Sequence, residues 1–211
     1  MDNATVFVET NFLISLLYPH LRYKDHEAAK QLIERSRVGG YDLVIPFYST
    51  FESLATTRRI KQEFTRWLSQ MEAYQDNLLK YQIISREQMD VLHKVNEQMD
   101  QYSEQDFEKN LQEIIDQIDV VHIDERVLQL ARYEISPLNI FTKGDSLDAY
   151  ILASIIKRCE EIGPDSVKIF MSTNTEEFNK VPEELLNKHK LVYINNFNFQ
   201  YGLKKWKEEY P

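Results

Sequence analysis

The chain contains little of what extracellular domains and membrane proteins depend on. Its 211 residues include one cysteine, Cys159, so an internal disulfide is excluded and a half-buried thiol is expected. Five glycines and six prolines are too few for a disordered chain or a turn-rich all-β fold. There is no apolar run that could span a bilayer and no signal-peptide pattern at the N-terminus. The sequence therefore predicts a cytoplasmic protein without a membrane partner.

The chain also has fewer basic than acidic residues. The chain has 25 basic and 34 acidic residues, which gives a net charge of −9. Residues 86–119 hold ten of the acidic residues and only three basic ones, whereas the remainder is close to balanced. The acidity therefore belongs to one region and does not prevent a polyanion from binding elsewhere. Charge alone is expected to give only modest affinity for nucleic acid.

Short apolar segments alternate with segments of helical periodicity along most of the chain. This alternation predicts an α/β fold: three α/β/α layers with a mainly parallel central sheet and helices on both faces. The expected strands are 5–8, 43–45, 120–123, 167–171 and 191–194. The expected helices start at Phe12, run over 25–34 with Asp25 as the cap, start at Ser49 or Thr50 and run toward Arg59, and cover 125–133 and 145–158.

The middle of the chain reads as an added helical region. Apolar residues recur at helical spacing in three runs, over 64–78, 89–99 and 107–118. Two pairs of residues, Ser85 with Gln88 and Ser103 with Asp106, have the spacing of capping boxes that would begin the second and third helices. We interpret the chain as one domain over 1–211 with a helical insertion at 62–119. Its apolar stripes are assigned to core packing, and a cofactor or partner groove is the alternative.

Acidic and amide side chains stand where the expected strands end or the expected helices begin. Glu9 directly follows the first strand, and Asn174 follows the strand at 167–171. Glu52 and Asp148 lie early in two helices. Ligands of open α/β sheets bind beyond the carboxyl ends of the strands, so these groups can meet at one edge. Such oxygen ligands suit Mg²⁺ or Mn²⁺, which points to metal-assisted cleavage of phosphodiester bonds.

The acidic residues on helices each have an ordinary structural role as an alternative. Asp145 stands at a helix start, and capping is favoured there over metal ligation. For Asp148 ligation is favoured, because its neighbours place it beside an apolar helix face. Taken alone, Glu52 would be an ordinary exposed glutamate on a helix. Only its combination with the other segments suggests that it is a metal ligand.

The residues after the strands also have alternatives. A carboxylate such as Glu9 at the end of a buried strand is costly unless it is paired or bound to a metal. Thr10 and Asn11 either cap the first helix or hold a ligand carboxylate in place. Asn174 is a turn residue or a helix cap if it is not a ligand.

Taken together, four segments in this order resemble the PIN domain nucleases, and they cover nearly the whole chain outside 60–119. No single segment is specific, and the order of the four carries the resemblance. Two departures are visible: Glu9 stands where the family has Asp, which lengthens the side chain, and Glu177 replaces a frequent Asp before Phe178. The segments are Glu9-Thr10-Asn11, Ile45 to Glu52, Asp148 to Ala153, and Ser172 to Phe178.

The resemblance implies a Mg²⁺- or Mn²⁺-dependent endoribonuclease. It implies that Glu9, Glu52 and Asp148 are the main catalytic and metal-binding carboxylates, with Asn174 assisting and Asp145 as a further metal ligand. Residues expected to support these ligands are Thr10, Asn11, Thr173 and Glu177. Four basic residues would contact phosphates of the nucleic acid: Arg58, Arg59, Lys61 and Lys143. The more ordinary role of such residues is to form the solvated face of a helix.

RNA or DNA, a homodimer and an inhibitory protein are the partners that this resemblance implies. Two other functions stay open. The first is a PIN-like protein-interaction module with weak or lost catalysis, whose acidic helical region binds a protein. The second is the toxin of a toxin–antitoxin pair, although this chain is long for one. A phosphatase-like α/β enzyme is disfavoured, because Glu9-Thr10-Asn11 does not supply the nucleophilic Asp that such enzymes carry after the first strand.

Overall fold

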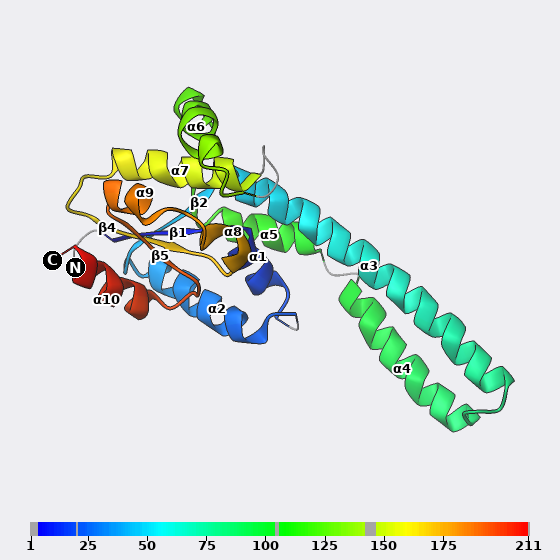
Figure 1. Ribbon diagram of the computed structural model, residues 1–211. Coiled ribbons are helices and arrows are strands. Elements are labelled where there is room, and N and C mark those ends of the chain that lie inside the picture. Colours follow the sequence, from blue (N-terminus) through cyan, green and yellow to red (C-terminus); the bar gives the residue numbers. More distant parts are fainter. Residues whose placement is uncertain (1–3, 20, 104–105, 142–146, 211) are drawn as a thin grey trace. The chain divides into compact units, whose positions relative to one another are not determined.

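The structure is a computed structural model that describes residues 4–19, 21–103, 106–141 and 147–210 (Figure 1). The chain divides into two compact units, one of Met1–Ser53 with Leu111–Pro211 and one of Leu54–Asn110. The first unit carries the sheet, and the second is helical. The bounds of this second unit differ from those of the insertion expected at 62–119.

All strands in the described part of the chain are parallel and belong to one five-stranded sheet with the order β3-β2-β1-β4-β5. The central strand is β1, where Val6 pairs with Leu43 on one side and with Ile169 on the other. This arrangement confirms the predicted α/β fold. The strands are β1 (Ala4–Val8), β2 (Asp42–Pro46), β3 (Asp119–Val121), β4 (Val167–Met171) and β5 (Leu191–Ile194).

Helices cover both faces of this sheet, with α7 (Leu147–Glu161) on one side and α2 (Tyr23–Arg37) and α10 (Phe199–Glu209) on the other (Figure 1). On the α7 side, buried aliphatic residues of the helix pack with Phe7 and Phe170. Cys159 of α7 is in the same core and is more deeply buried than expected. β1 and β4 are buried along their whole length, which explains their largely apolar sequences.

Several helix ends in the first unit differ from those expected. Glu9, not Thr10 or Asn11, caps the first helix. The second helix begins before Asp25, which lies in its first turn and does not cap it. The helix expected to run through Tyr133 ends at Gln129 and continues as a π-helical turn over Leu130–Ile135. The remaining helices of this unit are α1 (Thr10–Leu17), α6 (Glu125–Gln129), a 3₁₀ turn (Ser136–Leu138), α8 (Thr175–Phe178) and α9 (Glu183–Lys188).

One helix replaces two that the sequence suggested. The chain turns directly from β2 into α3 (Phe47–Lys80), a helix of 34 residues. The expected start at Ser49 or Thr50 was therefore too late. The expected break between Arg59 and Phe64 is absent, since that stretch contains no glycine or proline to interrupt the helix.

The two predicted capping boxes have different outcomes. At α4 (Arg86–Ser103), Ser85 and Gln88 exchange hydrogen bonds of 2.8 and 3.2 Å between side chain and backbone, as predicted. The second box is wrong, because Ser103 ends α4 and Asp106 caps the next helix, α5 (Phe107–Ile115), by accepting from the Lys109 N–H at 3.0 Å. None of the described helices is long and apolar enough to cross a membrane.

Candidate metal centre

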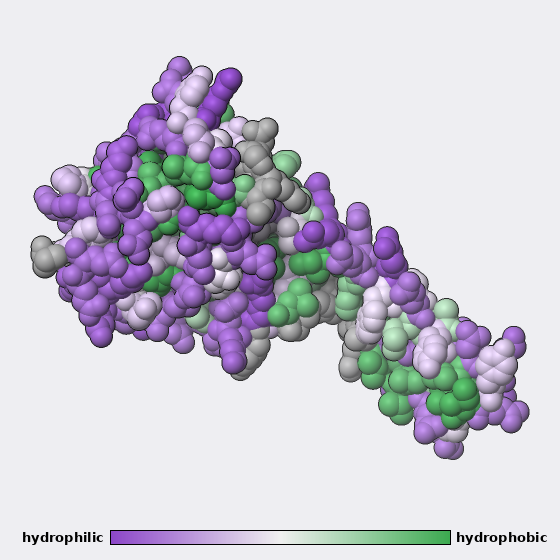
Figure 2. Space-filling view, viewed as in Figure 1, coloured by the Kyte–Doolittle hydropathy of each residue, from purple (hydrophilic) through white to green (hydrophobic). Residues whose placement is uncertain are grey.

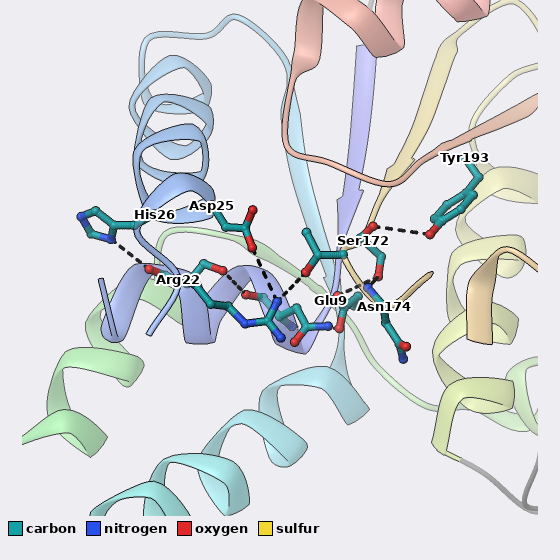
Figure 3. Close-up of polar contacts among 10 residues, drawn as sticks. Glu9, Arg22, Asp25, His26, Ser172, Asn174 and Tyr193 are labelled. Atoms are coloured by element: carbon teal, nitrogen blue, oxygen red, sulfur yellow. Dashed lines mark hydrogen bonds and ion pairs between the residues drawn. The ribbon is translucent and has the colours of Figure 1, made fainter. Parts of the chain in front are cut away.

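Glu9 lies at the carboxyl end of β1, and only 3 % of it is exposed. Its Oε2 accepts a hydrogen bond from the Asn11 N–H at 2.9 Å, and its Oε1 accepts one from the Ser172 hydroxyl at 2.9 Å (Figure 3). Burial raises the pKa of Glu9 to about 7 against the effect of these two hydrogen bonds, and the charges of Glu52 and Asp148 add to the rise. The carboxyl group is therefore fixed in position while its charged form is disfavoured.

Glu52 reaches the same region from the second turn of α3. The Thr10 hydroxyl donates a short hydrogen bond to Glu52 Oε2. Because Thr10 is the residue after Glu9, the start of α1 holds both carboxylates. Ser53, the next residue of α3, donates to the Ser49 carbonyl at 2.6 Å and closes the first turns of the helix. Thr10 thus contacts the Glu52 carboxylate, and its expected support of a metal ligand stays a prediction.

Asp148 comes from the first turn of α7 and is partly buried. Burial raises its pKa to about 6, and the charges of Glu52 and Glu177 contribute further. Glu52 therefore acts on both Glu9 and Asp148, although the three residues come from segments far apart in the sequence.

The turn after β4 completes this edge of the sheet. Besides binding Glu9, the Ser172 hydroxyl accepts from the Asn174 N–H at 2.9 Å (Figure 3). Asn174 is the N-cap residue of α8, but its side chain makes no capping hydrogen bond. The Tyr193 hydroxyl of β5 donates to the Ser172 carbonyl at 3.4 Å. The turn thus links three neighbouring strands at their carboxyl ends.

Two residues at this edge were not predicted as site residues. Ser172 was predicted only as part of the fourth motif. Its hydroxyl follows the strand next to β1, and this position could have indicated that it binds Glu9. Arg22 precedes α2, and its guanidinium donates to the Thr173 hydroxyl at 2.7 Å and forms an ion pair of 3.6 Å with Asp25 (Figure 3). Nothing in the sequence around Arg22 indicates this contact with the turn after β4.

Glu177 lies in α8, and its charge contributes to the raised pKa of Asp148. It also forms an ion pair of 3.7 Å with Lys180. Two further predicted residues, Asp145 and Lys143, lie outside the described residues. For them the expectations of metal ligation and phosphate contact stay predictions.

The predicted cations on α3 belong to the second unit. Arg58 is paired there through two parallel hydrogen bonds of 2.9 and 3.0 Å with the Glu108 carboxylate. Its planar donor face is therefore occupied by an acidic side chain of its own unit. Arg59 and Lys61 are exposed. Their expected contact with nucleic acid stays a prediction.

The donor set of Glu9, Glu52, Asp148 and Asn174 is composed only of oxygen ligands and suits a hard divalent cation. In the part of the chain that the structure describes, however, no three acidic, histidine or cysteine side chains are grouped closely enough to hold an ion. Oxygens of Glu9 and Glu52 accept hydrogen bonds from protein donors in this arrangement. A divalent cation among these residues would favour their charged forms and lower the raised pKa values.

Comparison with known families agrees with this geometry. A family model described as a PIN domain matches residues 6–178, a range that includes most of β1, the whole of β2, β3 and β4, and all four of these residues. The chain therefore belongs to the PIN domain family, whose members are generally nucleases. Searches of curated proteins and of solved structures found no match. The family match ends before α9, β5 and α10, although β5 completes the sheet.

Proposed function

We propose that this protein is a Mg²⁺- or Mn²⁺-dependent endonuclease, and specifically an endoribonuclease, that hydrolyses phosphodiester bonds. One observation carries the proposal. Glu9 and Asp148, from distant segments, have pKa values raised by burial and by the common neighbour Glu52 at the carboxyl edge of a parallel sheet. Membership of a family of nucleases supports the same conclusion.

Within this proposal the cation is held by Glu9, Glu52 and Asp148, with the Asn174 side chain assisting. When bound, it would supply an activated water and positive charge for the developing charge on phosphorus. The protein supplies the positions: Ser172 and the Asn11 N–H fix Glu9, and the Thr10 hydroxyl orients Glu52.

Arg22 adds a cation to this acidic edge. Its guanidinium is held at the turn after β4 through Thr173, one residue from Ser172. Part of the side chain is exposed, so it can meet a ligand. A positive charge held at this turn offsets repulsion of a phosphate group, which supports a polyanionic substrate.

The second candidate is a PIN-like protein-interaction module with weak or lost catalysis. It is favoured by large apolar side chains that are exposed on the second unit, among them Trp67, Tyr74 and Val91. In the toxin variant of the first function, the partner would be an inhibitory protein. Both alternatives predict a protein partner, whereas only the nuclease proposal and its toxin variant predict metal-dependent cleavage.

The test is cleavage of single-stranded RNA by the purified protein in Mn²⁺ or Mg²⁺, with chelator and a DNA strand of the same sequence in parallel. We expect Asp148→Asn to lose at least about 100-fold in rate, the size of loss when one electrostatic group leaves an active site. Asp165→Asn, an exposed carboxylate in the α7–β4 connection, is the matched control and should keep full activity. Equal activity of wild type and Asp148→Asn would overturn the proposal.

A further inference from the structure

At the carboxyl edge of the sheet, aromatic residues stand next to the carboxylates of the candidate metal centre. Neighbouring strands of the sheet follow one another in the order β3, β2, β1 and β4. His122 directly follows β3, Phe47 follows β2 and Glu9 follows β1. Because neighbouring strands lie ~4.8 Å apart, the end of β2 is one strand spacing from the end of β1. The candidate metal centre therefore has aromatic residues on its β2 and β3 side.

Two phenylalanine rings are exposed on the first two turns of α3. Phe47 and Phe51 are four residues apart, so they lie on the same side of the helix. Of these two residues, 38 % and 60 % is exposed. The ring of His122, which is also exposed, lies 5.8 Å from the ring of Phe47 at an angle of 37°. We name Phe47, Phe51 and His122 the aromatic platform.

The same turns of α3 connect the aromatic platform with the carboxylates. Glu52 directly follows Phe51, and successive residues of an α-helix project about 100° apart. Next to Glu52 on the helix surface, the ring of Tyr48 packs on Tyr150 of α7 with 5.0 Å between the ring centroids. Glu52 itself accepts from Thr10 at the start of α1. These two contacts fix the start of α3 against α7 and α1, so the platform has a defined place beside the candidate metal centre.

The exposed area of the aromatic platform suits nucleic-acid bases better than a protein. Aromatic side chains of ~150–250 Å² each give roughly 150–250 Å² for the exposed parts of Phe47 and Phe51, against ~800 Å² per partner in a standard protein interface. Every base has a π-face, and sites for single strands stack bases on exposed rings. None of the three platform residues carries a carboxylate that would repel a phosphate.

We propose that the aromatic platform stacks unpaired bases next to the phosphodiester bond that is cleaved, an inference that rests on the proposed nuclease function. Arg22 is held at the turn after β4, on one side of Glu9, and the platform lies on the other side. A strand that passes Glu9 thus has a cation for its phosphates on one side and rings for its bases on the other. Single-strand sites combine rings with positive charge in this way, and Arg22 and a bound divalent cation supply that charge.

The aromatic platform makes the protein selective for the form of the strand and not for its sequence. Stacking tolerates all bases, because each of them has a π-face. In a duplex the bases are paired and stacked on one another, so they reach the rings only if the duplex opens, which costs free energy. We therefore expect single strands and unpaired loops to be bound and duplexes to be excluded.

Other exposed rings of α3 are not part of the aromatic platform. Trp67 and Tyr74 belong to the second unit, where hydrophobic residues gather near the connection of α3 and α4 (Figure 2). The platform belongs to the first unit, together with Glu9 and Asp148. We therefore assign the platform, and not the rings of the second unit, to the bases beside the cleaved bond.

The test is binding of a fluorescently labelled single-stranded RNA to the full-length protein, measured by anisotropy in chelator so that metal-dependent cleavage does not interfere. We expect Phe51→Ala to raise Kd by about 5–100-fold, the effect of losing one stacked base. Phe51→Trp keeps a ring and should bind as wild type does. The matched control, Tyr201→Ala, removes a ring of α10 that is 52 % exposed and should leave Kd unchanged.

A second strand, in which abasic sugars replace the bases, shows whether the ring acts on a base. We expect wild type and Phe51→Ala to bind this strand equally, because the partner of the ring has been removed. A duplex of the first strand should likewise not distinguish the two proteins. Circular dichroism shows whether each variant keeps its helices.

Three outcomes would overturn the role of the aromatic platform: no binding of the single strand by wild type, equal binding by wild type and Phe51→Ala, and an equal loss for the abasic strand. If Phe51→Ala kept RNA binding but lost a protein partner, the rings would belong to that interface instead. Cleavage separates this inference from the proposed function. A wild type that cleaves RNA with Mn²⁺ as fast as Phe51→Ala does would keep the nuclease proposal and reject the platform, whereas a wild type without metal-dependent cleavage would reject the nuclease proposal itself.

Discussion

At the scale of single residues, the positions of the carboxylates in the candidate site depend on the hydrogen-bond donors that each of them contacts. Glu9 accepts hydrogen bonds from its own loop and from Ser172, and Glu52 accepts from Thr10. Thr10 touches none of the atoms that would react, so its role in the proposed reaction is to position Glu52. Removal of its hydroxyl should therefore weaken the site without removing a ligand.

We predict that Thr10→Val lowers metal affinity or cleavage by about 10–100-fold, the range typical of residues that orient a metal ligand. Thr10→Ser keeps a hydroxyl at this position and should restore most of the loss. Titration calorimetry with Mn²⁺ and the cleavage assay measure the two effects. If Thr10→Val and Thr10→Ser behave alike, the hydrogen bond to Glu52 does not matter for the site.

At the scale of elements, α10 shows how closely a helix outside the family match is fitted to the sheet. A Cβ atom at Gly202 would lie 2.8 Å from Ile169 Cγ2 of β4 and 3.1 Å from Ile194 Cδ1 of β5. Both neighbours are buried, so they have little room to move. The absence of a side chain at this one position lets the helix approach the sheet.

We predict that Gly202→Ala destabilises the protein by about 1–3 kcal/mol, the usual cost of overpacking a well-packed core. Gly163→Ala is the matched control, because a Cβ atom there meets nothing within 4 Å and should change stability little. Denaturant unfolding followed by circular dichroism gives both values. Equal stability of the two variants would show that α10 shifts to accept the methyl group.

The elements also show what the sequence could and could not predict. All five strands were found within one or two residues, because strands of a parallel sheet are short and largely apolar runs. The unbroken α3 was missed, because Ser49 and Thr50 are good caps and the helical periodicity does not show where one helix joins the next. At the candidate site, the order of the sequence motifs indicated Glu9, Glu52 and Asp148. The roles of Ser172 and Arg22 could not be predicted in this way. They depend on the pairing of β1 with β4 and on the path of the loop before α2, which only the structure shows.

At the scale of the whole molecule, the raised pKa values make stability depend on pH. The folded pKa of Glu9, about 7, is above its ordinary value of 4.5, so the folded state binds this proton more tightly than the unfolded state. The contribution of Glu9 to stability is therefore complete below pH 4.5 and is lost as the pH rises toward 7. Asp148, raised to about 6, acts in the same direction.

We predict that without divalent metal the wild type loses stability between pH 4.5 and 7, with a contribution of about 3 kcal/mol from Glu9. Glu9→Gln has no such charge to bury, so it should gain stability relative to wild type as the pH rises. Mn²⁺ should raise the unfolding temperature of wild type at pH 8 and have a smaller effect on Glu9→Gln. If the stability of the two proteins in chelator changed with pH in the same way, the pH dependence would not come from Glu9.

The lone thiol of the chain has a practical consequence. Cys159 lies on the buried face of α7, where burial raises its pKa to about 12. Alkylating reagents attack thiolates, so the native cysteine stays unreactive while the protein is folded. A cysteine introduced on the surface of either unit would then be the sole position that accepts a fluorescent or spin label. The natural sequence is therefore already suited to distance measurements by site-specific labelling.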